Sequence, residues 1–269
     1  MPTFTTYDGT ELTCRVVGNG NPLVVVPGGP LRATRYLGDL GGFGPEQELV
    51  MLELPPRRVD EIVADVDALR EHLGVDRLDL LAHSAGGDLA LLYAAAHPDR
   101  VRKLALITVG ASAVGIDVSD DVFRAALQRR SAEPWFDEAH AAILAWDAGD
   151  ASRANRAAAM PFFYGRWDEV AQAHAAAAPD ERDPDSAATY YADGAFDPAA
   201  TRTALSKLDA DVLVLVGGVD PGPTVNEGQS LARLFRNAEL VVQPGAGHYP
   251  WLDDTEAFVS TVSRFLAAR

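Results

Sequence analysis

The sequence is poor in the residues that build disulfides, thiolate metal sites and nucleic-acid interfaces. It has one cysteine, Cys14, in 269 residues, so an internal disulfide and a cage of several thiolates are both excluded. Basic side chains number 23 against 39 acidic ones, which gives a formal net charge of −16 at pH 7. A surface of this sign repels phosphate groups, so we expect neither nucleic acid nor an anionic membrane as a partner.

The sequence also lacks long apolar runs, and we expect no N-terminal leader. No stretch approaches the roughly 18 apolar residues that a membrane-spanning helix needs, and the first residues lack a basic stretch followed by an apolar one. We therefore expect a soluble, cytoplasmic protein. The sequence has neither a zinc-protease helix motif nor a phosphate-binding glycine loop, so we expect no metal and no organic cofactor. It leaves the oligomeric state open.

Short apolar runs bounded by turn residues recur along the chain. A hairpin is predicted over residues 4–17, with its turn at Asp8-Gly9. Near-continuous Val and Leu content, typical of parallel strands buried on both faces, marks residues 23–26, 50–54, 78–82, 104–109, 212–216 and 240–242. Amphipathic helices, such as one predicted over residues 60–73, alternate with these runs. The pattern predicts an α/β fold with a mostly parallel central sheet of about eight strands, including the hairpin, flanked by helices.

Residues 111–200 break this alternation, because no buried strand is evident there and Ala-rich helical segments alternate with loops. We interpret them as an inserted helical lid, or cap, on a core domain formed by residues 1–110 and 201–269. The segment holds 11 of the 21 aromatic residues, and 16 acidic against 7 basic residues. Five aromatic residues are candidates for lining the substrate pocket, although helix-packing core is an equal alternative: Trp135, Phe162, Phe163, Tyr164 and Trp167.

The strongest chemical signal is the sequence AHSAGG at residues 82–87, which joins a predicted strand to a predicted helix. A serine on such a sharp turn needs small residues two positions before and after it. Ala82 and Gly86 meet that need around Ser84, although glycine is the usual residue at the first position. Ser84 is therefore the candidate nucleophile, and the alternative is a tight turn with an incidental serine.

A serine hydroxyl becomes a useful nucleophile only when a base takes its proton. The sequence has six histidines, and His248 is the best placed, because it is flanked by a glycine and follows the last predicted strand. From the carboxyl end of that strand its side chain can reach over the sheet to Ser84. His83, beside the serine, is expected to point to the far side of the turn.

The imidazole in turn needs a carboxylate that fixes its tautomer and stabilises its charged form. Asp220 follows the predicted strand 212–216 and is our candidate, with a β-turn aspartate as the alternative. Asp253 and Asp254 are too near His248 in the sequence for an easy approach.

Acyl transfer also needs backbone N–H groups that face the developing negative charge on oxygen. We expect one from Ala85, at the start of the helix, where the helix dipole assists. The other is expected from Gly29, in the segment Pro27–Pro30 after the first parallel strand. The alternative for this segment is that its glycines only form a turn.

Taken together, these residues make the chain resemble the α/β-hydrolase fold family over nearly its whole length. The order Ser84, Asp220, His248 is similar to the order of that family, and the lid follows the strand at which the family commonly inserts one. Within the family, Gly28–Pro30 resembles the His-Gly-Gly-Pro-Gly stretch of the proline iminopeptidase group, with Pro27 replacing His. That group's Asp-x-Arg-Gly-x-Gly-x-Ser motif is absent, and residues 53–58 read ELPPRR instead.

The resemblance implies a serine hydrolase that acts on a small-molecule or short-peptide substrate, an ester or an amide. An iminopeptidase-like activity would need counter-charges for a protonated amine, which lid carboxylates could supply: Glu133, Asp137, Glu138, Asp147, Asp168 and Glu169. Carboxylesterase, thioesterase, carbon–carbon bond hydrolase and perhydrolase activities stay open, because the same triad can support each of them. A non-catalytic receptor with this fold is the alternative of a different class.

Overall fold

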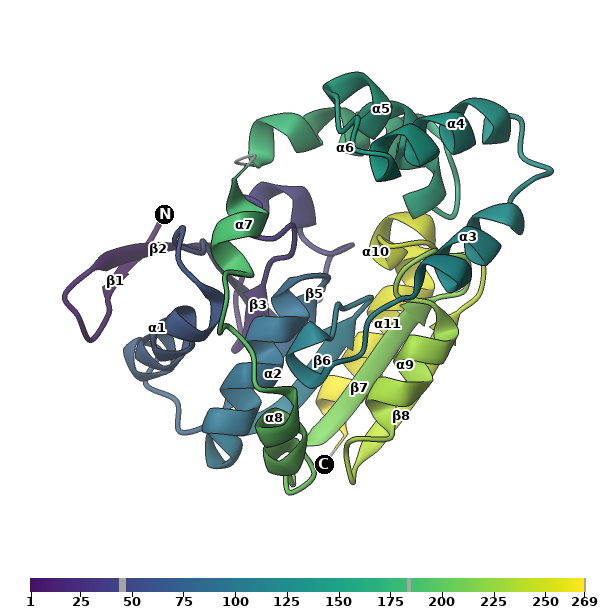
Figure 1. Ribbon diagram of the computed structural model, residues 1–269. Helices are drawn as coiled ribbons and strands as arrows, with labels where there is room; N and C mark the ends of the chain where they lie inside the picture. The colour runs from purple at the N-terminus through teal and green to yellow at the C-terminus, as the bar shows by residue number, and fades with distance from the viewer. Residues whose placement is uncertain (44–46, 183–184, 269) are drawn as a thin grey trace.

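Each short apolar run of the sequence forms a strand of one mixed sheet. A computed structural model describes residues 1–43, 47–182 and 185–268 (Figure 1). The sheet contains the following strands: β1 (Thr3–Thr5), β2 (Glu11–Gly18), β3 (Asn21–Val26), β4 (Gln47–Leu52), β5 (Leu78–His83), β6 (Val101–Ile107), β7 (Asp211–Gly217) and β8 (Ala238–Gln243). The predicted N-terminal hairpin is confirmed as β1 and β2, which pair antiparallel with Phe4 opposite Leu12.

The strand order across the sheet is β1-β2-β4-β3-β5-β6-β7-β8. Strand β2 pairs antiparallel with β4, and every further pair is parallel, with Val24 of β3 opposite Leu80 of β5. The predicted α/β fold with a mostly parallel sheet is therefore confirmed. In such a sheet the carboxyl ends of β3, β5, β6, β7 and β8 meet at one edge, which is where ligands bind in open α/β folds.

Helices cover both faces of the sheet. The described α-helices are α1 (Val59–His72), α2 (Gly86–Ala96), α3 (Asp120–Gln128), α4 (Phe136–Asp147), α5 (Arg153–Ala159), α6 (Glu169–Ala177), α7 (Ser186–Tyr190), α8 (Pro198–Leu205), α9 (Val225–Ala232), α10 (Pro250–Asp253) and α11 (Thr255–Ala267). In Figure 1, α1, α2, α8 and α9 lie on the near face, and α11 lies on the far face. Shorter 3₁₀ turns are η1 (Thr34–Leu37), η2 (Pro98–Arg100), η3 (Ser112–Val114), η4 (Met160–Phe163) and η5 (Ala178–Glu181). In the described part of the chain, no helix is both long and apolar enough to cross a membrane.

The two faces of the strands supply two separate hydrophobic cores. Val24 and Val26 of β3 pack on the side of α1 and α2, whereas Leu23 and Val25 of the same strand pack on the side of α11. Side chains alternate between the faces of a strand, so a strand covered on both sides is apolar at most positions. This explains the continuous Val and Leu runs of the sequence.

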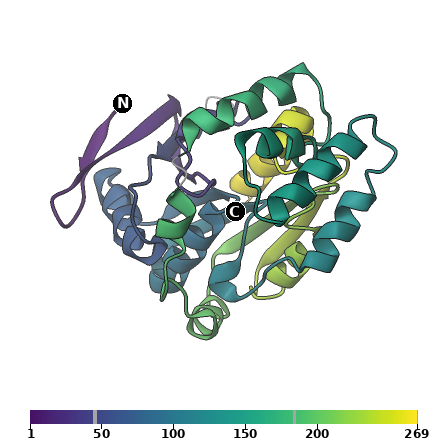
Figure 2. The same cartoon turned by 45° about the horizontal axis from the view of Figure 1, so that its top comes forward.

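The segment 111–200 forms helices α3 to α7, which lie over the carboxyl edge of the sheet (Figure 2). Its first half has a small apolar core of its own, in which Leu127 of α3, Phe136 of α4 and Phe162 of η4 come together. No strand lies in its described residues, although Ala111 and Ile116 form an isolated antiparallel bridge. The helical character expected from the Ala-rich sequence is thus observed, and α4 and α5 pack on one another.

Candidate active site

Ser84 lies on a sharp turn between β5 and α2. Its φ is +54°, a strained conformation for a residue with a Cβ atom. The segments around this turn come very close to one another, and only glycine leaves room for them. A Cβ atom on Gly86 would lie 2.5 Å from the Pro27 oxygen, and one on Gly28 would lie 2.6 Å from the Ser84 Cβ. Glycine is therefore required at both positions. Ser84 precedes the N-terminus of α2, where the helix dipole favours negative charge.

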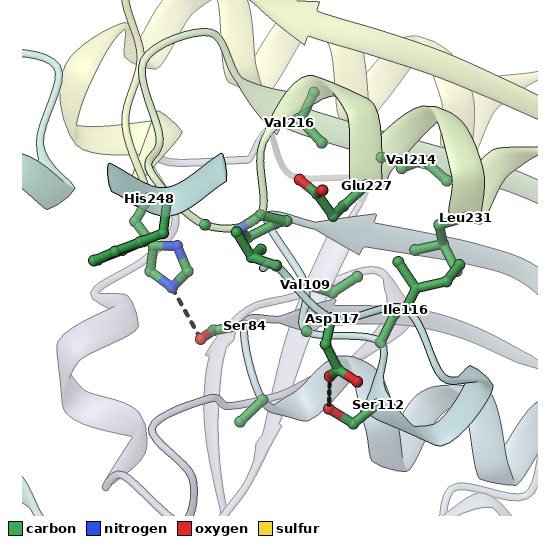
Figure 3. A pocket seen from close by; sticks show the side chains of 18 of the residues that line it. Ser84, Val109, Ser112, Ile116, Asp117, Val214, Val216, Glu227, Leu231 and His248 are labelled. Atoms are coloured by element: carbon green, nitrogen blue, oxygen red, sulfur yellow. Dashed lines mark hydrogen bonds between the residues drawn. The ribbon is translucent and has the colours of Figure 1, made fainter. Parts of the chain in front are cut away.

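His248 follows β8 and faces Ser84 across the edge of the sheet. Its Nε2 lies 2.9 Å from the Ser84 Oγ (Figure 3). The residue is fixed through its backbone as well: its N–H donates to the Phe163 oxygen over 2.8 Å, and its C=O accepts from the Thr108 hydroxyl over 2.9 Å. The imidazole is thus held at hydrogen-bond distance from the serine that the sequence singled out.

Asp220, in the turn after β7, supplies the carboxylate that meets this imidazole. Its Oδ2 lies 2.8 Å from the His248 Nδ1, and its side chain is fully buried. Its Oδ1 accepts the N–H of Gly222 over 3.0 Å, which fixes the plane of the carboxylate. The structure therefore brings together all three residues of the predicted triad.

Asp253, one of the two carboxylates close to His248 in the sequence, binds backbone N–H groups of two loops instead. Its two oxygens accept the backbone N–H groups of Gly247 (2.7 Å), Gly165 (2.9 Å) and Arg166 (3.2 Å). Burial raises the pKa of this carboxyl above its usual value. It ties the loop that carries His248 to the segment 111–200.

A cavity of about 390 Å³ opens beside Ser84 and His248. It extends between β7, α9 and the residues that follow β6 (Figure 3). Its wall is mostly apolar and includes Val109, Ile116, Phe123, Val214, Val216 and Leu231. Two carboxylates, Asp117 and Glu227, also line it, and no lysine or arginine is among its described lining residues. This chemistry suits a short apolar group and disfavours an anionic one.

The comparison with protein families agrees with this geometry. A family model described as the alpha/beta hydrolase fold matches residues 29–255, which is most of the chain. The chain belongs to the α/β-hydrolase fold family. The resemblance to this fold family that the sequence predicted is confirmed.

Individual relatives of this α/β-hydrolase have several activities. A pimeloyl-[acyl-carrier protein] methyl ester esterase of Neisseria meningitidis is 29% identical over 240 residues, which cover 85% of this chain and 80% of the esterase. A (lyso)-N-acylphosphatidylethanolamine lipase of Bos taurus is 38% identical over only 76 residues, 28% of this chain and 22% of the lipase. A solved proline iminopeptidase of Mycobacterium smegmatis shares the fold, with a TM-score of 0.73 at 22% identity, over 98% of this chain and 97% of that protein.

The two predicted oxyanion donors of the hydrolase, Gly29 and Ala85, both line the cavity beside Ser84. Gly28 is excluded as a donor because its N–H already donates to the Tyr36 hydroxyl over 2.8 Å. Among the described residues, the N–H groups of Gly29 and Ala85 have no hydrogen-bond acceptor. Both are therefore free to donate to a bound substrate.

The aromatic residues that the sequence suggested for the pocket lie elsewhere. The described lining of the cavity includes none of Trp135, Phe162, Phe163, Tyr164 and Trp167. The rings of Trp135 and Phe162 meet edge to face at 5.0 Å inside the small core of the segment 111–200. For these two residues the structure matches the alternative of helix-packing core.

The other three lie around the loop that carries His248. Tyr164 stacks on Tyr249 at 4.9 Å, and Trp167 lies 5.5 Å from Tyr164. Phe163 comes nearest the catalytic candidates, with its ring 6.1 Å from that of His248. These aromatics support the histidine loop from behind rather than facing the cavity.

The cavity instead uses residues that the sequence did not single out. Asp117, Phe123 and Tyr191 come from the two ends of the segment 111–200, and Glu227 and Leu231 come from α9. The six lid carboxylates considered as counter-charges are absent from the described lining. The sequence offered one signal for these lining residues, which was their position. Residues directly after β6 must lie at the same edge of the sheet as Ser84.

Asp88 links α2 to the cavity wall and gives the stability of the folded chain a testable pH dependence. This fully buried carboxylate accepts the Ala113 N–H over 2.8 Å and the Tyr191 hydroxyl over 3.4 Å. Burial raises its pKa to about 6. The folded state thus binds the proton of the Asp88 carboxyl more tightly than the unfolded state does. The stability that this proton contributes is present at low pH and is lost as the pH rises through about 6.

We expect this group to lower the free energy of unfolding by up to about 3 kcal/mol between roughly pH 4 and pH 7. Asp88→Asn should remove that part of the pH dependence, as measured by urea unfolding across this range. Asp137→Asn, at an exposed carboxylate of α4, is the control and should leave the dependence unchanged. Equal pH dependence in the wild type and in Asp88→Asn would contradict the assignment.

Proposed function

We propose that this chain is a serine hydrolase that cleaves small esters or amides through an acyl-enzyme. The observation that carries the proposal is the unbroken series of hydrogen bonds from Ser84 through His248 to Asp220, 2.9 and 2.8 Å long. A serine, an imidazole and a buried carboxylate in this order are the working parts of acyl transfer.

In the proposed reaction the Ser84 Oγ attacks the carbonyl carbon while the His248 Nε2 takes its proton. Asp220 stabilises the imidazolium that forms. The N–H groups of Gly29 and Ala85 donate to the negative carbonyl oxygen. His248 then protonates the departing oxygen or nitrogen, and a water molecule deprotonated by the same imidazole releases the acid from Ser84.

The cavity supports substrates with an apolar group. Its volume of about 390 Å³ and its Val, Leu, Ile and Phe side chains suit an apolar group on one side of the ester. The carboxylates of Asp117 and Glu227 disfavour a negative charge on the substrate. We further propose that the segment 111–200 acts as the lid of this site, since its two ends contribute Asp117, Phe123 and Tyr191 to the wall.

The test compares p-nitrophenyl butyrate with the p-nitrophenyl half-ester of succinic acid, which has a similar length but an added carboxylate. We expect hydrolysis of the butyrate ester. The kcat/KM for the succinate ester should be lower by a factor of about ten or more. Asp117→Asn should narrow this difference. Absence of turnover of the butyrate ester by folded protein would argue against the proposed function, and equal rates would argue against the charge assignment.

An aminopeptidase acting on N-terminal proline is the second candidate, and the carboxylates of Asp117 and Glu227 are the observation that favours it. A protonated amine could pair with them while the proline ring meets the apolar wall. Glu227 is already engaged, because it accepts the Thr224 N–H over 3.0 Å at the start of α9. Proline p-nitroanilide decides between the two candidates: turnover of esters alone removes the aminopeptidase.

A further inference from the structure

His83, the neighbour of the candidate nucleophile, lies in a directed chain of hydrogen bonds that the triad does not use. The residue ends β5 and is 2% exposed. Its Nδ1 lies 2.7 Å from the Tyr36 hydroxyl, and its Nε2 lies 2.9 Å from the backbone oxygen of His248. Burial lowers the pKa of His83 well below its usual value, so the ring is neutral. The side chain points away from Ser84, as expected from the sequence, but it contacts both loops that flank the serine.

The partners of His83 fix which atom carries each hydrogen. The carbonyl oxygen of His248 can only accept, so the His83 Nε2 must carry the proton. In a neutral ring the Nδ1 is then an acceptor, and the Tyr36 hydroxyl must donate to it. The Tyr36 oxygen is left to accept the Gly28 N–H, 2.8 Å away. The series of hydrogen bonds therefore runs from the Gly28 N–H to the Tyr36 O–H, to the His83 ring, and on to the His248 carbonyl.

The two ends of this series of hydrogen bonds, at Gly28 and His248, lie beside groups that the proposed reaction needs. Gly28 precedes Gly29, whose N–H is a proposed oxyanion donor, and the carbonyl of His248 belongs to the proposed base. Ser84 follows His83 directly. The buried ring of His83 thus connects the Gly28–Gly29 loop, the turn at Ser84 and the loop that carries His248.

Tyr36 is itself held from two further sides. The Arg32 guanidinium lies 4.2 Å from the centre of its ring. Its backbone oxygen accepts from the Nε2 of His174, 3.0 Å away on α6 of the segment 111–200. The phenol is 5% exposed, so its hydroxyl has little access to water as a substitute partner. Its position is therefore set by the protein on every side.

We propose that His83, as the neutral Nε2–H tautomer, is a positioning residue of the hydrolytic site. It holds the Gly28–Gly29 loop and the His248 loop in register with Ser84 through the chain formed by Gly28, Tyr36, His83 and His248, which we call the His83 bridge. The inference rests on the proposed hydrolytic function and assigns a role to a residue outside the triad.

The test measures kcat, KM and the rate of labelling by a fluorophosphonate in variants of the His83 bridge. His83→Phe keeps a ring but removes both hydrogen bonds, and Tyr36→Phe removes only the hydroxyl. We expect each to lower kcat and the labelling rate about 10- to 100-fold, with KM within about twofold, because a displacement of about 1 Å is costly in acyl transfer. His83→Gln restores a donor toward the His248 carbonyl, and His83→Asn restores an acceptor toward Tyr36, so both should retain more activity than His83→Phe.

Tyr93→Phe is the matched control, because it removes another buried phenol hydroxyl, one that bonds to Asp67 instead of to the bridge. It should label at the wild-type rate. Wild-type rates in folded His83→Phe and Tyr36→Phe, or an equal loss in Tyr93→Phe, would overturn the proposal. If the His83 variants do not fold, ¹⁵N NMR of histidine-labelled wild type decides: the Nε2–H tautomer supports the bridge, and the Nδ1–H tautomer overturns it. A wild type that takes no label would refute the hydrolytic function instead.

Discussion

The Ser84→Ala variant is expected to hydrolyse a small p-nitrophenyl ester about 10⁶-fold more slowly than the wild type. The substitution removes the oxygen that lies 2.9 Å from the His248 Nε2, and no acyl-enzyme can form without it. The measurement is kcat under steady-state conditions, with circular dichroism to verify the fold.

Ser112→Ala is the matched control for this result. Ser112 also lines the cavity, but its hydroxyl donates to Asp117 over 2.6 Å instead of meeting His248. The control should keep most of the wild-type turnover. A loss below about tenfold in Ser84→Ala would mean that another residue attacks the substrate.

The Asp220→Asn variant should lose about 10⁴-fold in kcat. Asparagine preserves the shape of the side chain, but its amide cannot stabilise an imidazolium, and it can stabilise the wrong tautomer of His248. The effect is measured as kcat, because binding of the substrate does not depend on this buried side chain.

Asp254→Asn serves as the control for Asp220→Asn. Asp254 caps α11, where its carboxylate accepts the Ala257 N–H over 3.0 Å, and asparagine caps a helix equally well. We expect near wild-type turnover in this variant. If Asp220→Asn loses less than about tenfold, a different carboxylate assists the base.

The sequence predicted the sheet and the proximity of Ser84, Asp220 and His248, because both rest on local patterns with few alternatives. The apolar runs of β3 and β7 are continuous because each strand is buried on two faces. Ser84, Asp220 and His248 each follow a predicted strand, and parallel strands bring their carboxyl ends to one edge. Their convergence therefore followed from topology alone.

The lining of the cavity could not be predicted in the same way. Periodicity shows which face of a helix is apolar but not which element covers that face. Phe162 thus reads equally well as pocket or as core, and it packs in the core of the segment 111–200. His83 was correctly expected to point away from Ser84, but its two partners come from positions 36 and 248, which no local pattern connects. The division of the chain into core and lid stays a prediction.

The most direct test of the account is whether a fluorophosphonate forms a covalent bond with the Ser84 oxygen. Intact-mass measurement of the wild type should show one phosphonyl group per chain, peptide mapping should place it on Ser84, and His248→Ala should slow the labelling strongly. Folded wild-type protein that gains no mass, or that carries the group on another residue, would contradict the claim that His248 activates Ser84.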